Sequence, residues 1–276
     1  MATNTPLFLP LVMVALFLQT AYGGDLGVYW GQDSDEGTLS EACATRKYAS
    51  INIAFLNQFG HGRKPEFNLT AGHCGPSSSG CQAAIRECQS KGVKVFLSNG
   101  ATDGNYSLAS KDDAKNMADY LWNSYLGGKS SSRPLREAVL DGIDFTLEAG
   151  APTDFYSDLA GFLSGYSTQG NKLYGTGLFD YVWIRFYGSF TCSFFPGYQN
   201  ALLGARDKGA AFIKARKILL RLPVKMQPKT GTSRPNELMN LILPPIKRSS
   251  KYRGVVLWSK YFDDKNGCSN AINAAV

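Results

Sequence analysis

Seven short runs rich in Val, Ile, Leu and aromatic residues recur along the chain, separated by longer amphipathic stretches. They do not alternate strictly between apolar and polar residues, as expected for strands buried on both faces of a parallel sheet. The runs cover residues 26–30, 50–56, 93–98, 139–147, 180–187, 217–222 and 254–259. Helices are predicted between them over residues 36–48, 80–92, 110–126 and 151–166. This repetition of strand and helix units predicts an α/β fold with a parallel sheet.

A barrel is the arrangement that these units favour. About 250 residues follow the N-terminal segment, a length at which an α/β barrel is commonly one domain. A doubly wound nucleotide-binding sheet is the alternative, but no GxGxxG or Walker loop follows any run. We therefore predict a (β/α)8 TIM barrel that shows seven strands instead of eight. The pattern fails at 167–179, where "STQGNKLYGTGLF" has room for only a short strand.

The first 23 residues are predicted to be a secretory signal peptide. An apolar run ends in small residues, with Ala21 and Gly23 at the −3 and −1 positions of a cleavage site. A membrane anchor is the alternative, but the run is short for a span of about 20 apolar residues and holds two prolines. Residues 24–276 are expected to form one barrel domain of a secreted protein.

The charge and the cysteines fit secretion. The net charge is +7, but the basic residues are scattered, without the aromatic–basic interleaving of nucleic-acid modules. The six cysteines stand at 43, 74, 81, 88, 192 and 268. Disulfides are the default for a secreted chain, and the four cysteines in 43–88 fit two local bridges. A metal site is disfavoured because there is no CxxC pair and His61 and His73 have poor ligand spacing, so no metal or cofactor is expected.

The stretch "DGIDFTLEAG", residues 141–150, carries three acids at the end of a predicted strand. The active site of a barrel lies at the carboxyl ends of its strands, where Asp141, Asp144 and Glu148 stand. Alternate side chains of a strand share a face, which groups Asp144 and Glu148 with the neutral Thr146. Glu148 is the candidate general acid, because a carboxylic acid in a partly apolar barrel mouth suits that role. The alternative is a charged strand end, in which the aspartates cap loops and Glu148 faces solvent.

Aromatic residues stand at the ends of several other predicted strands. Such residues fill cores more often than they bind ligands, so each alone is a weak signal. Gathered at the mouth of a barrel, they would form the floor of a sugar site, because the apolar faces of sugars stack on aromatic rings. These residues are Tyr29, Trp30, Phe55, Phe186, Tyr187 and Trp258.

Several long segments resemble one family. They are "GVYWGQ", "INIAFLNQFG", "NLTAGHC", "SLASKDDAKNMADYLWNSYLGGKSSSRPL", "AVLDGIDF", "TGLFDYVWIRFY" and "GVVLWSKYFDDKNG". Through them the chain is similar to the plant class III (hevamine-type) endochitinases, acidic or basic, of glycoside hydrolase family 18. The resemblance covers nearly all of residues 24–276. It implies a TIM barrel and a retaining hydrolysis of the β-1,4 bonds of chitin, in which the substrate's own N-acetyl oxygen attacks the anomeric carbon.

The family motif DGxDxDxE, at the end of the fourth barrel strand, implies roles for residues of this chain. Glu148 is implied to be the general acid, and Tyr187 is implied to contact the N-acetyl group. Asp144 and Asp141 are implied to be supporting acids, which completes the set of catalytic residues. Four further residues match positions that bind the substrate, the tryptophan lying beneath the sugar at the cleavage site. They are Trp258, Tyr29, Phe55 and Asn68.

The chain departs from the family pattern around this site. Thr146 stands where the family has the aspartate that orients the N-acetyl group, so a hydroxyl replaces a charge. Arg185 stands where a glutamine is usual, and "SNGATDGNY" replaces the Gly-rich end of the third strand. The family's fifth strand and the segment after it, which belong between Tyr174 and Gly175, are missing. The expected fold is therefore a barrel without its fifth βα unit.

The resemblance also implies how the cysteines pair. The implied bridges are Cys43–Cys88 and Cys74–Cys81. The usual partner of Cys192 belongs to the missing segment, which leaves a bridge between Cys192 and Cys268 open. Two N-glycosylation sequons, at Asn68 and Asn105, are either used or unused, and a glycan at Asn68 would obstruct the cleft.

Two functions follow from the resemblance and its departures. The first is an endochitinase of weakened or lost activity that acts on or binds chitin and its oligosaccharides. The second is a non-catalytic lectin, or an inhibitor whose partners are microbial xylanases and other glycosidases. We expect a monomer secreted to the apoplast rather than the vacuole, without nucleic-acid or membrane partners. A storage role has no specific support in the sequence.

Overall fold

The structure, a computed structural model, describes much of the chain that follows the predicted signal peptide. That peptide, residues 1–23, and the weak segment 167–179 lie outside the described residues. The described ranges are 25–69, 72–74, 79–101, 104–146, 153–166, 180–185, 217–223 and 235–276. Within these ranges, no helix combines the length and the apolar character needed to cross a membrane.

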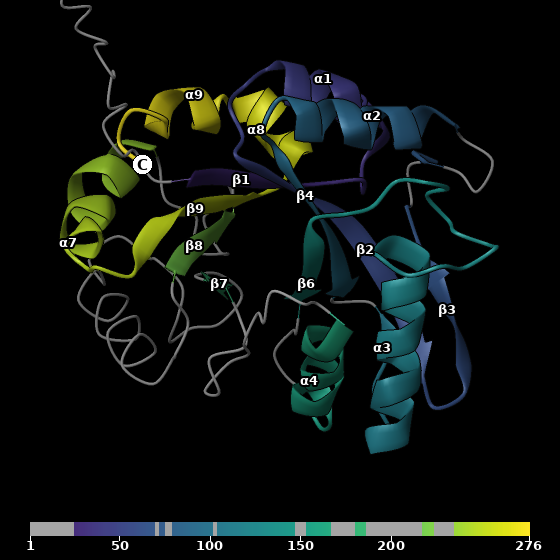
Figure 1. Cartoon of the computed structure of the whole chain (residues 1–276). Helices are drawn as coiled ribbons and strands as arrows, with labels where there is room; N and C mark the ends of the chain where they lie inside the picture. The colour runs from purple at the N-terminus through teal and green to yellow at the C-terminus, as the bar shows by residue number, and fades with distance from the viewer. Residues whose placement is uncertain are drawn as a thin grey trace, which may run out of the picture.

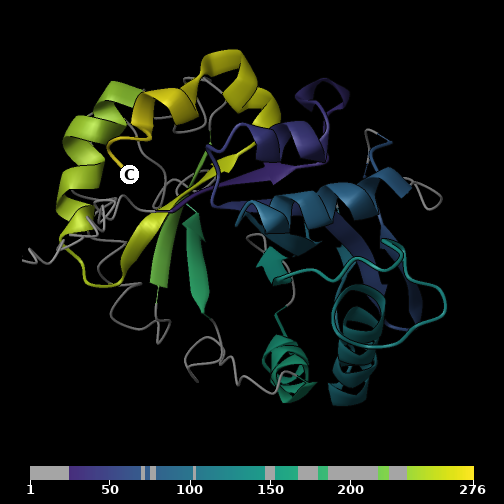
Figure 2. The same cartoon turned by 45° about the horizontal axis from the view of Figure 1, so that its top comes forward.

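Seven parallel strands form one curled sheet (Figures 1 and 2). Their order across the sheet is β6-β4-β2-β1-β9-β8-β7. The strands are β1 (Asp25–Trp30), β2 (Ser50–Gly60), β4 (Lys94–Gly100), β6 (Gly142–Thr146), β7 (Tyr181–Arg185), β8 (Lys217–Pro223) and β9 (Tyr252–Trp258). Two short strands pair with the long β2, β3 (Arg63–Phe67) running antiparallel and β5 (Asn105–Tyr106) parallel to it. The seven predicted strands and the barrel-type fold are thus confirmed.

The sheet is open between β6 and β7. These strands follow one another in the chain order of the barrel strands, yet within the described ranges no strand pairs with both of them. Aromatic rings approach each other across the interior here: the centroid of Phe96 on β4 lies 6.1 Å from that of Trp183 and 6.5 Å from that of Tyr181, both on β7. The fold is therefore an incomplete TIM barrel, whose opening lies where the fifth unit was predicted to be missing.

The first strand of the barrel joins its two halves. β1 pairs with β2 on one side and with β9 on the other, with Asp25 opposite Gly254. The carboxylate of Asp25 also accepts a hydrogen bond from Arg253 Nε at 2.7 Å. Gly254 has a φ of +150°, and a Cβ there would lie 1.9 Å from the carbonyl oxygen of Asp25. Only glycine therefore fits this close approach of β9 to β1.

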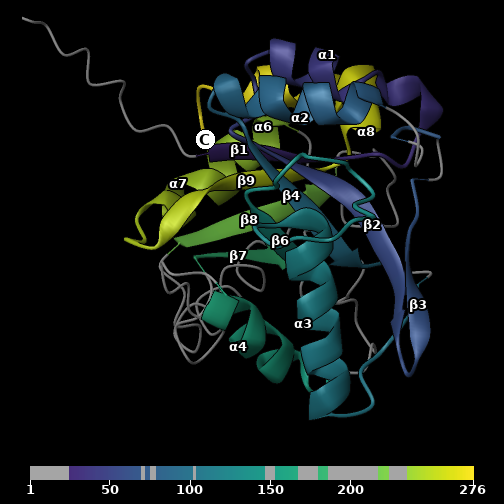
Figure 3. The same cartoon turned by 45° about the vertical axis from the view of Figure 1, so that its right-hand side comes forward.

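Helices cover the outer face of the sheet, with α1, α2 and α8 gathered at one end and α3 and α4 toward the other (Figures 1 and 3). They are α1 (Leu39–Ala44), α2 (Ser79–Ser90), α3 (Lys111–Tyr125), α4 (Tyr156–Tyr166), α6 (Pro235–Glu237), α7 (Leu243–Lys247), α8 (Lys260–Asn266) and α9 (Cys268–Ile272). A 3-10 turn, η1 (Ser34–Glu36), and a π-helical segment, η2 (Leu238–Ile242), complete the elements. Each helix predicted from the sequence has a counterpart here.

Local capping explains where the boundaries differ from those predicted. The predicted helix 36–48 is two elements, because Thr38 and Glu41 form a capping box that starts α1 anew after η1. Ser110 caps α3, as its sequence predicted, by accepting a hydrogen bond from the backbone N–H of Asp113. The strand predicted over 139–147 begins only at Gly142, since the backbone N–H of Leu140 bonds instead to α3 at Tyr125.

The two faces of the sheet differ in character. The outward face, beneath the helices, is apolar and fully buried, with Val28, Ile51, Ile53, Val95, Leu97, Val255 and Leu257 each 0% exposed. The inward face carries polar groups that are also buried, among them Asn52, Ser98, Asp144 and Arg221. Buried polar groups need partners, so the barrel interior is where hydrogen-bonded chemistry is concentrated.

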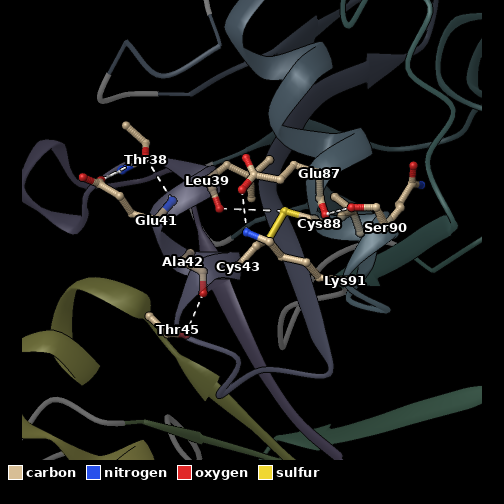
Figure 4. The surroundings of a disulfide bond; sticks show 12 residues. Thr38, Leu39, Glu41, Ala42, Cys43, Thr45, Glu87, Cys88, Ser90 and Lys91 are labelled. Atoms are coloured by element: carbon tan, nitrogen blue, oxygen red, sulfur yellow. Dashed lines mark hydrogen bonds and ion pairs between the residues drawn. A yellow bond between two sulfur atoms is a disulfide. The ribbon is translucent and has the colours of Figure 1, made fainter.

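Two disulfides are present among the described residues, in the pairing that the resemblance implied. Cys43–Cys88 ties α1 to α2, and both cysteines are almost fully buried (Figure 4). Cys74–Cys81 joins residue 74 to the first turn of α2. Cys268 is a free, buried thiol, and Cys192, its partner in the bridge that the sequence left open, lies outside the described residues. Burial and the nearby Asp263 raise the pKa of Cys268 to about 12, which leaves it an unreactive thiol.

Glu36, the last residue of the 3-10 turn η1, has a buried carboxyl group. Its side chain is 0% exposed, and its Oε1 accepts hydrogen bonds from the backbone N–H groups of Gly31 and Asp33. Its Oε2 has no hydrogen-bond partner among the described residues. Burial raises the pKa of Glu36 above its ordinary value of 4.5, and the two N–H groups and His73 offset only part of that rise.

We expect the Glu36→Gln variant to gain stability relative to the parent protein as the pH rises above about 4.5. A raised folded-state pKa means that the unfolded chain ionises first, so the free energy of unfolding of the parent falls with rising pH until the folded-state pKa is passed. Denaturant unfolding of both proteins between pH 4 and pH 7 measures this difference. Glu41→Gln is the control with the opposite slope, because hydrogen bonds from Thr38 lower the pKa of Glu41. The stability that Glu41 contributes is lost as the pH falls below about 4.5, so the scan of this control extends down to about pH 2.5. A difference between Glu36→Gln and the parent that does not change with pH would contradict the expectation.

Candidate functional site

The carboxyl ends of the parallel strands bring inward-facing side chains to one end of the barrel. They come from β1, β2, β4, β6, β8 and β9, which are far apart in the sequence. The residues that form this group are Tyr29, Asn52, Phe55, Ser98, Asp144, Thr146, Arg221 and Trp258. Strand pairing alone thus brings together four of the eight predicted catalytic and substrate-binding residues, namely Tyr29, Phe55, Asp144 and Trp258.

Asp144 is the centre of this group. Its side chain is 3% exposed, and one oxygen, Oδ2, accepts hydrogen bonds from four side chains. The donor distances are 2.7 Å from Ser98 Oγ, 2.9 Å from Tyr29 Oη, 3.0 Å from Thr146 Oγ1 and 3.5 Å from Asn52 Nδ2. The carboxylate is therefore held in one orientation by strands β1, β2, β4 and β6.

Thr146 is the neighbour of Asp144 on the inward face of β6. It is 3% exposed, and its hydroxyl is committed to Asp144 as a donor. The adjacent strand approaches closely at Gly100, which has a φ of +121° and where a Cβ would lie 2.2 Å from the carbonyl oxygen of Thr146. The position at which the family carries a second carboxylate is thus a tightly enclosed, neutral one.

Three aromatic rings, Tyr29, Phe55 and Trp258, form what we call the aromatic floor. The Phe55 and Trp258 rings stack at 5.5 Å between centroids with an interplanar angle of 18°, and Tyr29 lies 5.3 Å from Trp258. Tyr29 and Phe55 are buried, whereas Trp258 is only partly so. Trp258 is therefore the member of the floor best placed to meet a ligand.

Asn68 adjoins the aromatic floor through its backbone. Its N–H and carbonyl both pair with Phe55, at 2.9 and 3.1 Å, and its side chain is exposed. The amide of Gln32 reaches the carbonyl oxygens of both Ala54 and Asn68, at 2.5 and 3.3 Å. The structure therefore brings Asn68 close to the other predicted substrate-binding residues.

Asp141 is not brought into this group. It precedes β6, at the opposite end of the strand from Thr146. Its carboxylate accepts hydrogen bonds from Gln89 Nε2 at 2.9 Å, the Val95 N–H at 3.0 Å and Lys94 Nζ at 2.6 Å. These contacts tie the start of β6 to β4 and α2, a structural position remote from the carboxyl ends of the strands.

Two predicted catalytic residues, Glu148 and Tyr187, lie outside the described residues. Each follows the described part of its strand by two residues, β6 ending at Thr146 and β7 at Arg185. Their catalytic roles stay predictions. Cys192 also lies outside the described ranges.

The sequence analysis missed three residues of this group: Asn52 and Ser98, which donate to Asp144, and Arg221, the one cation among them. Its guanidinium carbon lies 4.2 Å from the centroid of the Tyr29 ring and 5.3 Å from that of Trp258, and the residue is only 6% exposed. A signal was present, because the strand "KILLRL" places an arginine on the same face as Lys217 and Leu219. A cation on the inward face of a barrel strand is unusual, and it indicates a functional site at the carboxyl end of that strand.

These contacts define what the group can do chemically. It offers a fixed carboxylate, a hydroxyl beside it, an indole ring in reach of a ligand, and a cation that contacts two of the three floor rings. Such a combination of aromatic faces and oriented polar groups is typical of a sugar-binding site.

Comparisons with known proteins give consistent results. A scan against protein-family models finds no match. An acidic endochitinase of Vitis vinifera is 47% identical over 298 residues, which cover 99% of this chain and 98% of that protein. Among solved structures, the ICChI chitinase from Ipomoea carnea is 40% identical with a TM-score of 0.82, covering 92% of this chain and 100% of its own. The xylanase–α-amylase inhibitor protein XAIP-I, in complex with trehalose, is 36% identical with a TM-score of 0.82, covering 91% and 98%.

Proposed function

Because the chain belongs to the plant class III endochitinases of glycoside hydrolase family 18, we propose that it binds N-acetylglucosamine oligomers and hydrolyses them slowly or not at all. The family membership rests on a relative that is 47% identical along almost its whole length. The binding site is the carboxyl end of the barrel. The aromatic floor supports sugar binding there, since Trp258 is partly exposed beside Phe55 and Tyr29. The two disulfides support the further proposal that the protein is secreted.

One observation carries the proposal of impaired hydrolysis: the hydroxyl of Thr146 lies 3.0 Å from Asp144 Oδ2, where the family has a second carboxylate. In the family's mechanism, Glu148 would protonate the glycosidic oxygen while the N-acetyl oxygen attacks the anomeric carbon, and positive charge develops on the resulting ring. A threonine hydroxyl can orient that group but cannot balance the charge. Losing such a preorganised charged partner typically costs roughly 10²–10³ in rate.

Turnover of a chitotriose-type reporter substrate tests the proposal. We expect the unmodified protein to release the reporter slowly, and Glu148→Gln to reduce that release to the background rate, because the substitution removes the acid and keeps the shape. Calorimetric titration with N-acetylglucosamine oligomers should detect binding by both proteins, and Trp258→Ala should abolish it. Turnover at the rate of an ordinary chitinase would overturn the impairment. A lack of binding by the unmodified protein would argue against the proposed ligand.

A second candidate function is inhibition of microbial glycosidases. The observation that favours it is the equally high structural similarity to a protein named as a xylanase–α-amylase inhibitor. Fold alone does not choose between the two functions, because one fold can carry several. Measuring the activity of a xylanase with and without this protein decides the point, since an inhibitor would act even when Glu148 is replaced by glutamine.

A further inference from the structure

The contact of Arg221 with the aromatic floor has a consequence for sugar binding. Its guanidinium lies in the angle between the Tyr29 and Trp258 rings, whose centroids are 5.3 Å apart. Phe55 already stacks on Trp258. A planar guanidinium is held well by ring faces, through the negative charge that those faces carry and through dispersion. Tyr29 and Trp258 therefore serve as a binding site for a side chain of the protein itself.

A sugar ring needs the same surface. Stacking of a pyranose requires an aromatic face free of other groups, and Trp258 is the only floor ring that is not fully buried. Arg221 is 6% exposed, so it is enclosed among the inward-facing side chains and does not extend into solvent. Guanidinium and sugar cannot both cover the Tyr29 side of the indole.

We propose that Arg221 is a built-in occupant of the sugar site: it covers the part of the aromatic floor that an N-acetylglucosamine ring would cover, and it must move before an oligomer binds. This inference rests on the proposed function and names a residue that determines the affinity of the same site. Each binding event then loses the Arg221 contacts with Tyr29 and Trp258, which weakens the apparent affinity for the oligomer.

Lys217 supplies a matched control. It lies on the same inward face of β8, four residues before Arg221, and its Nζ lies 4.9 Å from the centroid of the Tyr181 ring. It also donates a hydrogen bond to the Tyr181 hydroxyl at 3.3 Å, so it is likewise a cation held by a tyrosine, but at the amino end of the strand. Removing it changes the net charge by the same amount as removing Arg221.

Two measurements on Arg221→Ala and Lys217→Ala test the inference. The first is acrylamide quenching of Trp258 fluorescence, obtained as the difference between each protein and its Trp258→Phe partner. The second is calorimetric titration with an N-acetylglucosamine tetramer. We expect Arg221→Ala to make Trp258 more accessible to the quencher and to tighten tetramer binding at least tenfold. Lys217→Ala should leave both unchanged. If Arg221→Ala does not fold, Arg221→Val is the substitute, because valine suits a buried strand and is too short to cover the floor rings.

The two measurements separate the inference from the proposed function. If quenching of Trp258 is unchanged in Arg221→Ala, the inference is overturned, whatever the result of the tetramer titration. If quenching of Trp258 increases but neither protein binds the tetramer, Arg221 does cover the aromatic floor, but the proposed ligand is wrong. The inference is also overturned if the parent binds the tetramer and Arg221→Ala binds it with equal or lower affinity. A site freed of its occupant must bind more tightly.

Discussion

Replacing Thr146 with aspartate is expected to raise kcat for a chitotriose-type reporter by roughly 10²- to 10³-fold. The substitution puts a second carboxylate beside Asp144, at a position whose hydroxyl already lies 3.0 Å from Asp144 Oδ2. That carboxylate would balance the positive charge on the substrate in the transition state. KM should change little, because the new interaction strengthens mainly as the charge develops.

The control for this prediction is Thr146→Asn, which adds a hydrogen-bonding group of aspartate's shape without its charge. It should leave kcat within a few-fold of the parent value. Thr146→Asp should also give turnover a new pH dependence, because two carboxylates in contact cannot both ionise freely and would share a proton. An equal gain from asparagine and aspartate would mean that shape, not charge, limits the parent protein.

Combining Thr146→Asp with Arg221→Ala separates two defects by their kinetic signatures. The first substitution acts on kcat, whereas removing the occupant of the aromatic floor acts on KM. The double variant should therefore show both changes. Recovery of kcat by Arg221→Ala alone would assign the electrostatic defect to the arginine rather than to Thr146.

Removing the Cys43–Cys88 bridge by a double substitution with alanine is expected to lower the free energy of unfolding by about 4 kcal/mol. The bridge closes a loop with a sequence separation of 45 residues, and a chain-entropy estimate for that length gives this value. For a domain of this size the melting temperature should fall by about 8–16 °C. Both cysteines are almost fully buried between α1 and α2, so lost packing adds to the effect.

The second bridge, Cys74–Cys81, provides the comparison. Its sequence separation is only 7 residues, for which the same relation gives about 2.5 kcal/mol. Calorimetric melting of the two double-alanine variants measures both losses in one experiment. A larger loss at Cys74–Cys81 than at Cys43–Cys88 would contradict a loop-entropy origin of the stabilisation.

The fold could be predicted from the sequence because its signals are local. Each strand is a continuous apolar run, and α3 begins at a serine with acids in its first turn. The register of the strands is not local, but parallel strands of one sheet align their carboxyl ends whatever their spacing along the chain. The gap after β6 was visible because the pattern itself fails at 167–179. Exact ends were not predictable where a tertiary contact decided them, as for Leu140 and α3.

The site was predicted less completely, for physical reasons that differ from residue to residue. Asp144 and Asp141 look equivalent in the motif, but Asp141 precedes β6 whereas Asp144 lies within it and faces the barrel interior, and only the assembled sheet reveals which of them joins the site. Arg221 was missed because a single cation in an apolar run is usually read as a solvent-facing residue. Its partners, Tyr29 and Trp258, lie 192 residues before and 37 after it, so no local pattern joins them.

The pairing of β1 with β9 sets the order in which the protein can fold during its synthesis. β1, β2, β4 and β6 pair in the order in which they leave the ribosome, so this half of the sheet can assemble while translation continues. The other edge of β1, including Asp25, waits for Gly254 and its neighbours, which are made more than 220 residues later. Until then that edge is an exposed template for pairing with other chains. Closure between β1 and β9 is therefore a late event, and this edge of β1 stays open during most of the chain's synthesis.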